Sequence, residues 1–91
     1  MKRNKRILIV DDEPFNILGL QIVLQQSGVK HILDFVDKAV NGKVAVNMVK
    51  KAYNDKQFSY GLIFMDCSMP IMNGYEATDS IRSFIKSKNM L

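Results

Sequence analysis

Three aspartates carry the chemistry that this sequence could perform. Asp11 and Asp12 directly follow the apolar residues 7–10, and Asp66 directly follows the apolar residues 62–65. Carboxylates that gather at one point repel one another unless a cation or a shared proton relieves the repulsion. Oxygen-only ligands favour a hard divalent cation, and Mg²⁺ leaves room for water and phosphate oxygens in its octahedral shell. If the three side chains meet, the sequence therefore predicts a magnesium site suited to phosphate chemistry.

Simpler roles for the same aspartates stay open. Asp66, at the end of a strand, can accept hydrogen bonds from nearby backbone N–H groups and cap the turn. Asp11 can cap the helix that follows it, in which case only Asp12 points inward. Asp12 and Asp66 are far apart in the sequence, so the fold decides between these roles and a shared site.

The elements that must position these aspartates are strands. Residues 7–10 are wholly apolar, and residues 62–65 after Tyr60 have the pattern of a central strand buried on both faces. Residues 32–37 alternate only in part, which favours an edge strand. In parallel sheets the ligand crevice lies beyond the carboxyl ends of the strands. Asp11, Asp12 and Asp66 are therefore expected at one edge of the sheet.

Helical patterns separate and follow these strands. The first helix is expected from about residue 15 to residue 26, behind Pro14 and before Ser27 and Gly28. The second covers residues 44–52 after a turn at Asn41 and Gly42, a polar loop follows at 54–57, and the third helix covers about residues 75–86. The order β-α-β-α-β-α predicts a parallel sheet with helices on both faces. The residues expected to face inward are Ile17, Leu20 and Leu24, then Ala45, Met48, Val49 and Ala52, then Ala77, Ile81, Phe84 and Ile85.

Composition limits the classes of function. A chain of 91 residues with a net charge of +4 is expected to form one small, soluble, intracellular domain, without a signal peptide or a membrane span. One cysteine and one histidine leave no zinc site, so Cys67 is expected to be a small buried residue and His31 a surface residue. Four of the thirteen basic residues lie in the first six positions, and no aromatic pattern or motif supports nucleic-acid binding there.

Three segments together resemble a known family. They are residues 7–13 (ILIVDDE), residues 37–45 (DKAVNGKVA) and residues 65–77 (MDCSMPIMNGYEA). The joint pattern resembles the receiver domain of two-component response regulators and hybrid histidine kinases, over nearly the whole chain. The resemblance implies a three-layer, flavodoxin-like α/β fold with a parallel sheet whose first three strands have the order 2-1-3.

The resemblance also implies roles for particular residues. Asp66 would be the phosphoacceptor, taking a phosphoryl group from a phosphohistidine on a histidine kinase or a histidine phosphotransfer protein. Mg²⁺ would be held by Asp12 and Asp66, by Asp11 largely through water, and by the backbone carbonyl of Ser68. Phosphoryl transfer depends mainly on positioning and charge neutralisation, which agrees with this set of ligands. The chain would act in the cytoplasm as a phosphoacceptor and not as a turnover enzyme, without direct contact to nucleic acid or membrane.

The sequence departs from the family after its third βα unit. Residues 1–91 are expected to form a single receiver domain that lacks the fourth and fifth units, with their hydroxyl, lysine and aromatic switch residues. The third strand would then be an exposed edge that allows self-association. An alternative function is a receiver fragment that cannot be phosphorylated and acts only as a protein-interaction module. A third hypothesis is a phosphatase with an aspartyl nucleophile, which would resemble the haloacid dehalogenase class. That class needs a second acid two residues after the nucleophile, and this chain has Ser68 there, so the sequence does not match it.

Overall fold

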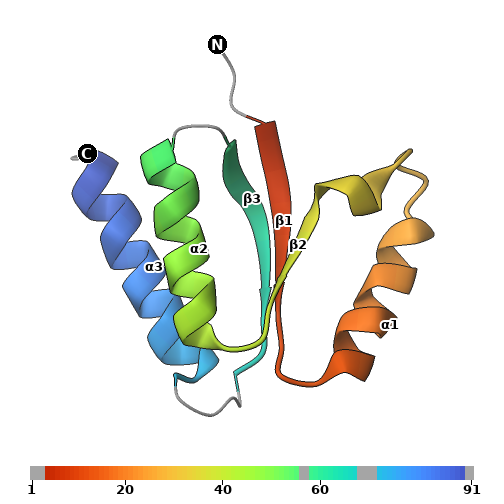
Figure 1. Cartoon of the computed structure of the whole chain (residues 1–91), viewed down its shortest axis with the longest axis horizontal. Helices are drawn as coiled ribbons and strands as arrows, with labels where there is room; N and C mark the ends of the chain where they lie inside the picture. The colour runs from red at the N-terminus through yellow and green to blue at the C-terminus, as the bar shows by residue number, and fades with distance from the viewer. Residues whose placement is uncertain (1–3, 56–57, 68–71, 90–91) are drawn as a thin grey trace.

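The computed structural model describes residues 4–55, 58–67 and 72–89, and Figure 1 shows their arrangement. Strands and helices alternate along the chain, as the sequence predicted. The elements are β1 (Asn4–Val10), α1 (Pro14–Gln25), the 3₁₀ helix η1 (Ile32–Phe35), β2 (Val36–Ala39), α2 (Gly42–Asp55), β3 (Phe58–Met65) and α3 (Gly74–Asn89). None of the helices in these ranges is long and apolar enough to cross a membrane.

The strands form one parallel sheet with the order β2-β1-β3, which confirms the predicted order. Helix α1 covers one face of the sheet, and α2 and α3 lie side by side on the other, so the molecule has three layers (Figure 1). The register of β1 with β3 shifts once, because Arg6 pairs with Tyr60 and the next residue, Ile7, pairs with Leu62. Gly61 is therefore an extra residue in β3, a bulge in the middle of the strand.

The hydrophobic core lies between the sheet and the α2 and α3 layer. Leu8 and Val10 of β1 are fully buried there, against small and branched residues of the two helices. The remaining members are Ala39, Ala45, Val46, Val49, Ala77 and Ile81. The inward positions predicted for α2 and α3 are confirmed except for Ile85, which lies in the last turns of α3 and is exposed.

Helix α1 is covered much less than its sequence suggests. It carries apolar residues on all sides and no charged residue, yet none of its residues is buried. The three side chains predicted to face inward, Ile17, Leu20 and Leu24, are only half-buried, and Phe15 is 80% exposed. A helix that is apolar all round is normally enclosed by other elements. Here a sheet of three strands contacts α1 from one side.

Residues 32–37 do not form the single strand that was predicted. Ile32–Phe35 is the 3₁₀ helix η1, and β2 is confined to Val36–Ala39, which pairs with residues 7–10 of β1. The Asp34 amide donates to the His31 carbonyl (3.0 Å), which is a local 3₁₀ bond, and Arg6 Nη2 of β1 donates to the Asp34 carbonyl (3.2 Å), which is a tertiary bond that holds the turn. A local pattern of apolar residues does not encode this contact with β1.

Strand β3 is longer and more exposed than predicted. It begins at Phe58, and Leu62 is 48% exposed, so the expectation of burial on both faces is wrong. The reason is that β3 is the last strand of the described sheet, with β1 on one side only. Its Phe64 borders a cavity shared with α1, while Ile63 and Met65 pack against the core.

Candidate metal centre

The ends of β1 and β3 bring distant aspartates together. The Asp66 amide donates to the Val10 carbonyl (2.9 Å), and the Asp11 amide donates to the Ala39 carbonyl (3.1 Å). These bonds continue the parallel ladders by one residue beyond each strand, so the strands fix the backbone of both aspartates. Sequence analysis predicted this placement because each apolar run stops directly before an acid.

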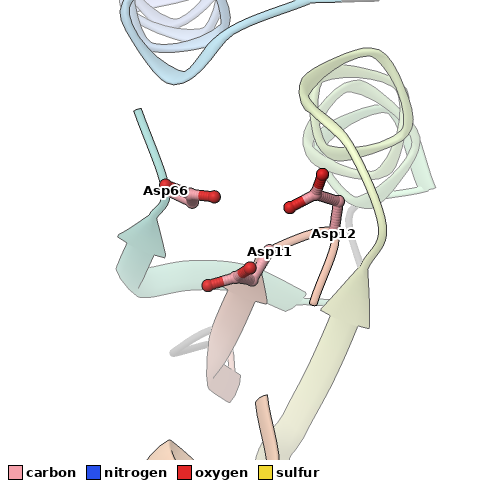
Figure 2. A group of neighbouring side chains, drawn as sticks. All are labelled: Asp11, Asp12 and Asp66. Atoms are coloured by element: carbon pink, nitrogen blue, oxygen red, sulfur yellow. The ribbon is translucent and has the colours of Figure 1, made fainter. Parts of the chain in front are cut away.

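The carboxylates of Asp11, Asp12 and Asp66 form one cluster. Each residue offers an oxygen within 4.8 Å of the oxygens offered by the other two. Figure 2 shows Asp66, at the end of β3, facing Asp11 and Asp12 at the end of β1. Asp11 and Asp66 are half-buried and Asp12 is exposed, so the cluster is open to solvent on one side. The predicted convergence of the three acids is confirmed.

Asp11 also forms bonds at the start of α1. Its Oδ1 atom accepts from the Glu13 amide (2.9 Å) and from Asn16 Nδ2 (3.4 Å). The N-cap of α1 is Glu13, whose carboxylate accepts from the Phe15 amide (3.3 Å). Asp11 therefore does both things that the sequence left open, since it orders the turn before α1 and still belongs to the cluster. The alternative in which only Asp12 points inward does not hold.

The first residue of α3, Gly74, packs directly against the backbone of Asp66 and Cys67. A Cβ atom on Gly74 would overlap the Asp66 carbonyl oxygen and lie 2.8 Å from the Cα atom of Cys67. Asn73 and Glu76 form a reciprocal cap, because each side chain accepts from the backbone amide of the other (2.9 and 3.2 Å). Glycine at position 74 thus lets a capped helix start directly against the strand end that carries Asp66.

The remaining predicted residues have mixed outcomes. Ser68 lies outside the described residues. Cys67 is exposed, so the prediction of a buried residue is wrong, because it lies two residues beyond Met65, the last residue of β3. His31 is exposed, as predicted, and has a left-handed backbone conformation (φ 59°) at the start of η1.

A cavity beside the cluster was not predicted. It has a volume of about 470 Å³ and extends from Asp11 and Asp66 along the face of the sheet that α1 covers. Its apolar walls include Phe15 and Leu20 of α1 and Phe64 of β3. The signal in the sequence was the absence of charge from α1, which indicates a helix with apolar neighbours on more than one side.

A polar network at the opposite end of the sheet was also missed. Asp37 of β2 accepts from Arg6 Nε (3.0 Å) and Nη2 (2.9 Å) of β1 and from the Tyr60 hydroxyl (2.7 Å) of β3. The bonds from Arg6 hold the pKa of Asp37 below its ordinary value of 3.8. Burial, with the bond to Asp37, raises the pKa of Tyr60 well above its ordinary value of 10. One carboxylate therefore joins all three strands.

Comparison with known proteins now identifies the family. The model of the response regulator receiver domain matches residues 7–90. This chain belongs to the receiver domain family. Its receiver sequence is 42% identical over 77 residues to the two-component response regulator ORR41 of Oryza sativa subsp. japonica, covering 85% of this chain and 55% of that protein. It is 41% identical over 83 residues to hybrid signal transduction histidine kinase B of Dictyostelium discoideum, covering 91% of this chain and 4% of that protein.

Solved receiver structures have the same fold. The receiver domain of the histidine kinase CKI1 from Arabidopsis thaliana, complexed with Mg²⁺ and BeF₃⁻, superposes with a TM-score of 0.75 at 34% identity, covering 94% of this chain and 60% of that one. The receiver domain of Ssk1 from Saccharomyces cerevisiae, solved with the histidine phosphotransfer protein Ypd1, superposes with a TM-score of 0.73 at 30% identity, covering 98% and 54%. The chain thus spans little more than half the length of several of the proteins that it matches.

Proposed function

We propose that this receiver is a phosphoacceptor in a two-component phosphorelay, with Asp66 as the residue that takes the phosphoryl group. Residues 1–91 would act as one receiver domain. The observation that carries the proposal is the cluster of Asp11, Asp12 and Asp66, whose carboxylate oxygens lie within 4.8 Å of one another. Membership of the receiver family gives this cluster its functional meaning.

The donor set fits Mg²⁺. Opposite ligands of an octahedral Mg²⁺ lie about 4.2 Å apart, since each bond is about 2.1 Å long. Three carboxylate oxygens within 4.8 Å therefore suit an ion that some of them contact directly and others through water. Asp12 and Asp66 would be direct ligands, Asp11 would act largely through water, and the Ser68 carbonyl would complete the protein's share. The Mg²⁺ complex of the CKI1 receiver supports this choice of ion.

The reaction is a transfer between two nucleophiles. A carboxylate oxygen of Asp66 attacks the phosphorus of a phosphohistidine, an O–P bond forms and the N–P bond breaks. The bonding pair leaves with the imidazole nitrogen, which takes up a proton, and Asp66 becomes an acyl phosphate. When bound, Mg²⁺ would supply positive charge to the oxygens of the transferring group. The Asp66–Val10 backbone bond holds the acceptor at a fixed place on the sheet edge.

The proposed donor is a histidine phosphotransfer protein or a histidine kinase. Support comes from the Ssk1 receiver, which was solved in complex with such a phosphotransfer protein. Exposed apolar residues of α1, among them Phe15 and Leu18, suit a helical partner, and Phe15 lines the cavity that Asp11 and Asp66 border. In this role the chain is a phosphoryl acceptor and not a turnover enzyme, and it acts in the cytoplasm with its kinase.

Phosphorylation by a small donor tests the proposal. The purified chain is incubated with acetyl phosphate and Mg²⁺, and intact mass is measured. We expect a gain of one phosphoryl group that requires Mg²⁺ and is abolished in Asp66→Asn. Asp79→Asn is the matched control, because Asp79 is an exposed aspartate of α3 outside the cluster. A folded wild-type chain that gains no phosphoryl group, or an Asp66→Asn chain that still gains one, would refute the proposal.

A second candidate function is that of an interaction module that assembles through β3. The observation that favours it is the exposure of Leu62 on a strand paired on one side only within the described sheet. Such an edge can pair with a strand of a second copy. Sedimentation velocity over a range of concentrations tests this candidate independently of phosphorylation, and a chain that stays monomeric at high concentration would refute it.

A further inference from the structure

We propose that Asn16 of α1 is a positioning residue of the metal centre, and that it favours Mg²⁺ over Ca²⁺ by holding Asp11 so that it offers one oxygen. The proposal deepens the proposed function and rests on it, since it concerns the same three aspartates. Asn16 itself would contact neither the ion nor the phosphoryl group. It would act through its bond to the Asp11 carboxylate.

The place of Asn16 follows from how α1 begins. Glu13 is the N-cap of the helix and Pro14 is its first residue, so Asn16 is the third helical residue. The Asn16 amide donates to the Glu13 carbonyl (3.0 Å) and closes the first turn. This turn brings the Asn16 side chain back to the residues that precede the helix, where its Nδ2 atom reaches Asp11.

Two hydrogen bonds to the Asp11 carboxylate end on the same oxygen. The Glu13 amide donates to Oδ1 (2.9 Å), and Asn16 Nδ2 donates to Oδ1 as well (3.4 Å). One carboxylate oxygen has about two lone-pair sites. The two donors therefore use the capacity of Oδ1, and Oδ2 is the oxygen that Asp11 can offer to an ion or to its bound water.

Asn16 adds the second point of attachment that fixes the plane of this carboxylate. The backbone of Asp11 is held by its bond to the Ala39 carbonyl (3.1 Å) and its Oδ1 atom by the Glu13 amide. One hydrogen bond leaves a carboxylate free to rotate about that contact, whereas two donors from different residues resist the rotation. Outer-shell partners orient metal ligands in this way.

Mg²⁺ and Ca²⁺ differ in what they require of a carboxylate. Mg²⁺ binds its ligands at about 2.0–2.1 Å in a near-octahedral arrangement and keeps several waters. Ca²⁺ binds about six to eight oxygens at longer distances and accepts both oxygens of one carboxylate. An Asp11 that offers Oδ2 alone suits Mg²⁺ and denies Ca²⁺ a bidentate ligand. Without the bond from Asn16, Asp11 could turn and present both oxygens to the larger ion.

A neutral donor suits this position better than a charged one. Asp11, Asp12 and Asp66 already place three carboxylate oxygens within 4.8 Å of one another. A lysine or arginine beside them would neutralise part of the charge that attracts the metal ion, and a further carboxylate would repel Asp11. The amide of Asn16 orients Asp11 and leaves the charge of the cluster unchanged.

Metal titrations followed by NMR test the role of Asn16 without phosphoryl transfer. Backbone amide shifts of the chain are recorded against MgCl₂ and, separately, CaCl₂, which gives a dissociation constant for each ion. Asn16→Leu removes the donor and keeps the size of the side chain. Loss of an outer-shell partner typically weakens metal binding about 10–100-fold. Because Asn16 is exposed and its bond is long, we expect the Mg²⁺ constant to rise about three- to tenfold and the Ca²⁺ constant to change less than about twofold.

Two further variants show whether the missing amide causes the change. Asn47→Leu is the matched control, because Asn47 is an exposed asparagine of α2 outside the cluster, and it should leave both constants unchanged. Asn16→Ala also lacks the donor, so it should repeat the loss of Mg²⁺ affinity. Leucine and alanine both have high helix propensity, so α1 is expected to form in each variant, and the amide spectra check this.

The outcomes separate the role of Asn16 from the proposed function. An unchanged Mg²⁺ constant in either variant of Asn16, an equal loss for Mg²⁺ and Ca²⁺, or the same loss in Asn47→Leu overturns the role of Asn16. If Mg²⁺ binding is lost in Asp12→Asn but unchanged in Asn16→Leu, the metal centre stands and only the role of Asn16 is overturned. A folded wild-type chain that binds no Mg²⁺ refutes the metal centre and the role of Asn16 together.

Discussion

Replacement of Asp37 by asparagine should destabilise this receiver far more than its place near the surface suggests. The carboxylate of Asp37 joins three strands, since it accepts two bonds from Arg6 of β1 and one from Tyr60 of β3. Asparagine keeps the size of the side chain but removes its charge and one acceptor oxygen. The Arg6 guanidinium would then lose its counter-charge, and one of the three donors would lose its acceptor.

The magnitude follows from the burial of the pair. Hydrogen bonds to charged groups contribute about 1.5–3 kcal/mol each when well buried. The Arg6 and Asp37 side chains are 25% and 26% exposed, so solvent screens part of the attraction. We therefore expect Asp37→Asn to lower the free energy of unfolding by about 2 kcal/mol in total. Asp55→Asn is the control, because its pair with Lys51 is exposed at both ends and should contribute less than about 0.5 kcal/mol.

The effect should depend on pH in a defined direction. Arg6 lowers the pKa of folded Asp37 below the value of 3.8 that the unfolded chain would show. The unfolded state therefore binds more protons in this range, and the stabilisation is complete above the unfolded pKa. It is lost as the pH falls through the lower pKa of the folded state. The difference between wild type and Asp37→Asn should thus be constant above about pH 5 and shrink at more acidic pH.

Urea unfolding followed by circular dichroism measures both quantities, on wild type and on each variant at a series of pH values. The Asp37→Asn and Asp55→Asn curves are compared at equal protein concentration, because self-association would add to apparent stability. The reasoning is refuted if the two substitutions cost the same at neutral pH. It is also refuted if the cost of Asp37→Asn persists unchanged well below pH 3.8.

Two further predictions concern the site and its surroundings. Gly74→Ala should lower the free energy of unfolding by more than about 2 kcal/mol, because the added Cβ would overlap the Asp66 carbonyl. Gly19→Ala is the control, because Gly19 lies in open space within α1 and alanine there should raise the free energy of unfolding by about 0.5–1 kcal/mol. Thermal unfolding shows whether the two changes have opposite signs, and equal effects would contradict the contact at Gly74. Phe15→Ala should slow phosphoryl transfer from a phosphohistidine protein at subsaturating donor and leave the rate with acetyl phosphate unchanged. Reactions stopped at a series of times and analysed by intact mass measure both rates. An equal loss of rate with both donors would contradict a docking role for Phe15.

The position of the site could be predicted because it depends on where apolar runs stop. Asp11 and Asp66 each follow a strand directly, and parallel strands end at a common edge, so local sequence was enough to bring them together. The apolar pattern of residues 62–65 wrongly indicated that Leu62 is buried, because a central strand and an edge strand can have the same local sequence and differ only in their neighbours. The prediction that Cys67 is buried was wrong for a related reason, since its exposure depends on the path of the chain after the strand ends.

The conformation of residues 32–35 depends on a contact that the local sequence does not contain. Their apolar pattern suits a strand, but the Asp34 carbonyl accepts from Arg6 of β1, and the chain turns there into η1. The same arginine binds Asp37, so one side chain fixes both the turn and the start of β2. Arg6 is separated from Asp34 by 28 positions and from Asp37 by 31 positions, so no periodic pattern in the local sequence indicates these contacts.

The proposed acceptor and the incompletely covered apolar surfaces lie in different layers of the fold. Asp66, the proposed acceptor, is held by β1 and by the start of α3, both of which contribute to the hydrophobic core. Helix α1 and the outer edge of β3 are apolar and incompletely covered. Among the described residues, α1 meets the acidic cluster through the Asp11 turn and through the cavity that Phe15 and Leu20 share with Asp11 and Asp66. If the proposed function holds, substitutions on the exposed face of α1 should change the rate with a phosphohistidine protein more than the rate with acetyl phosphate.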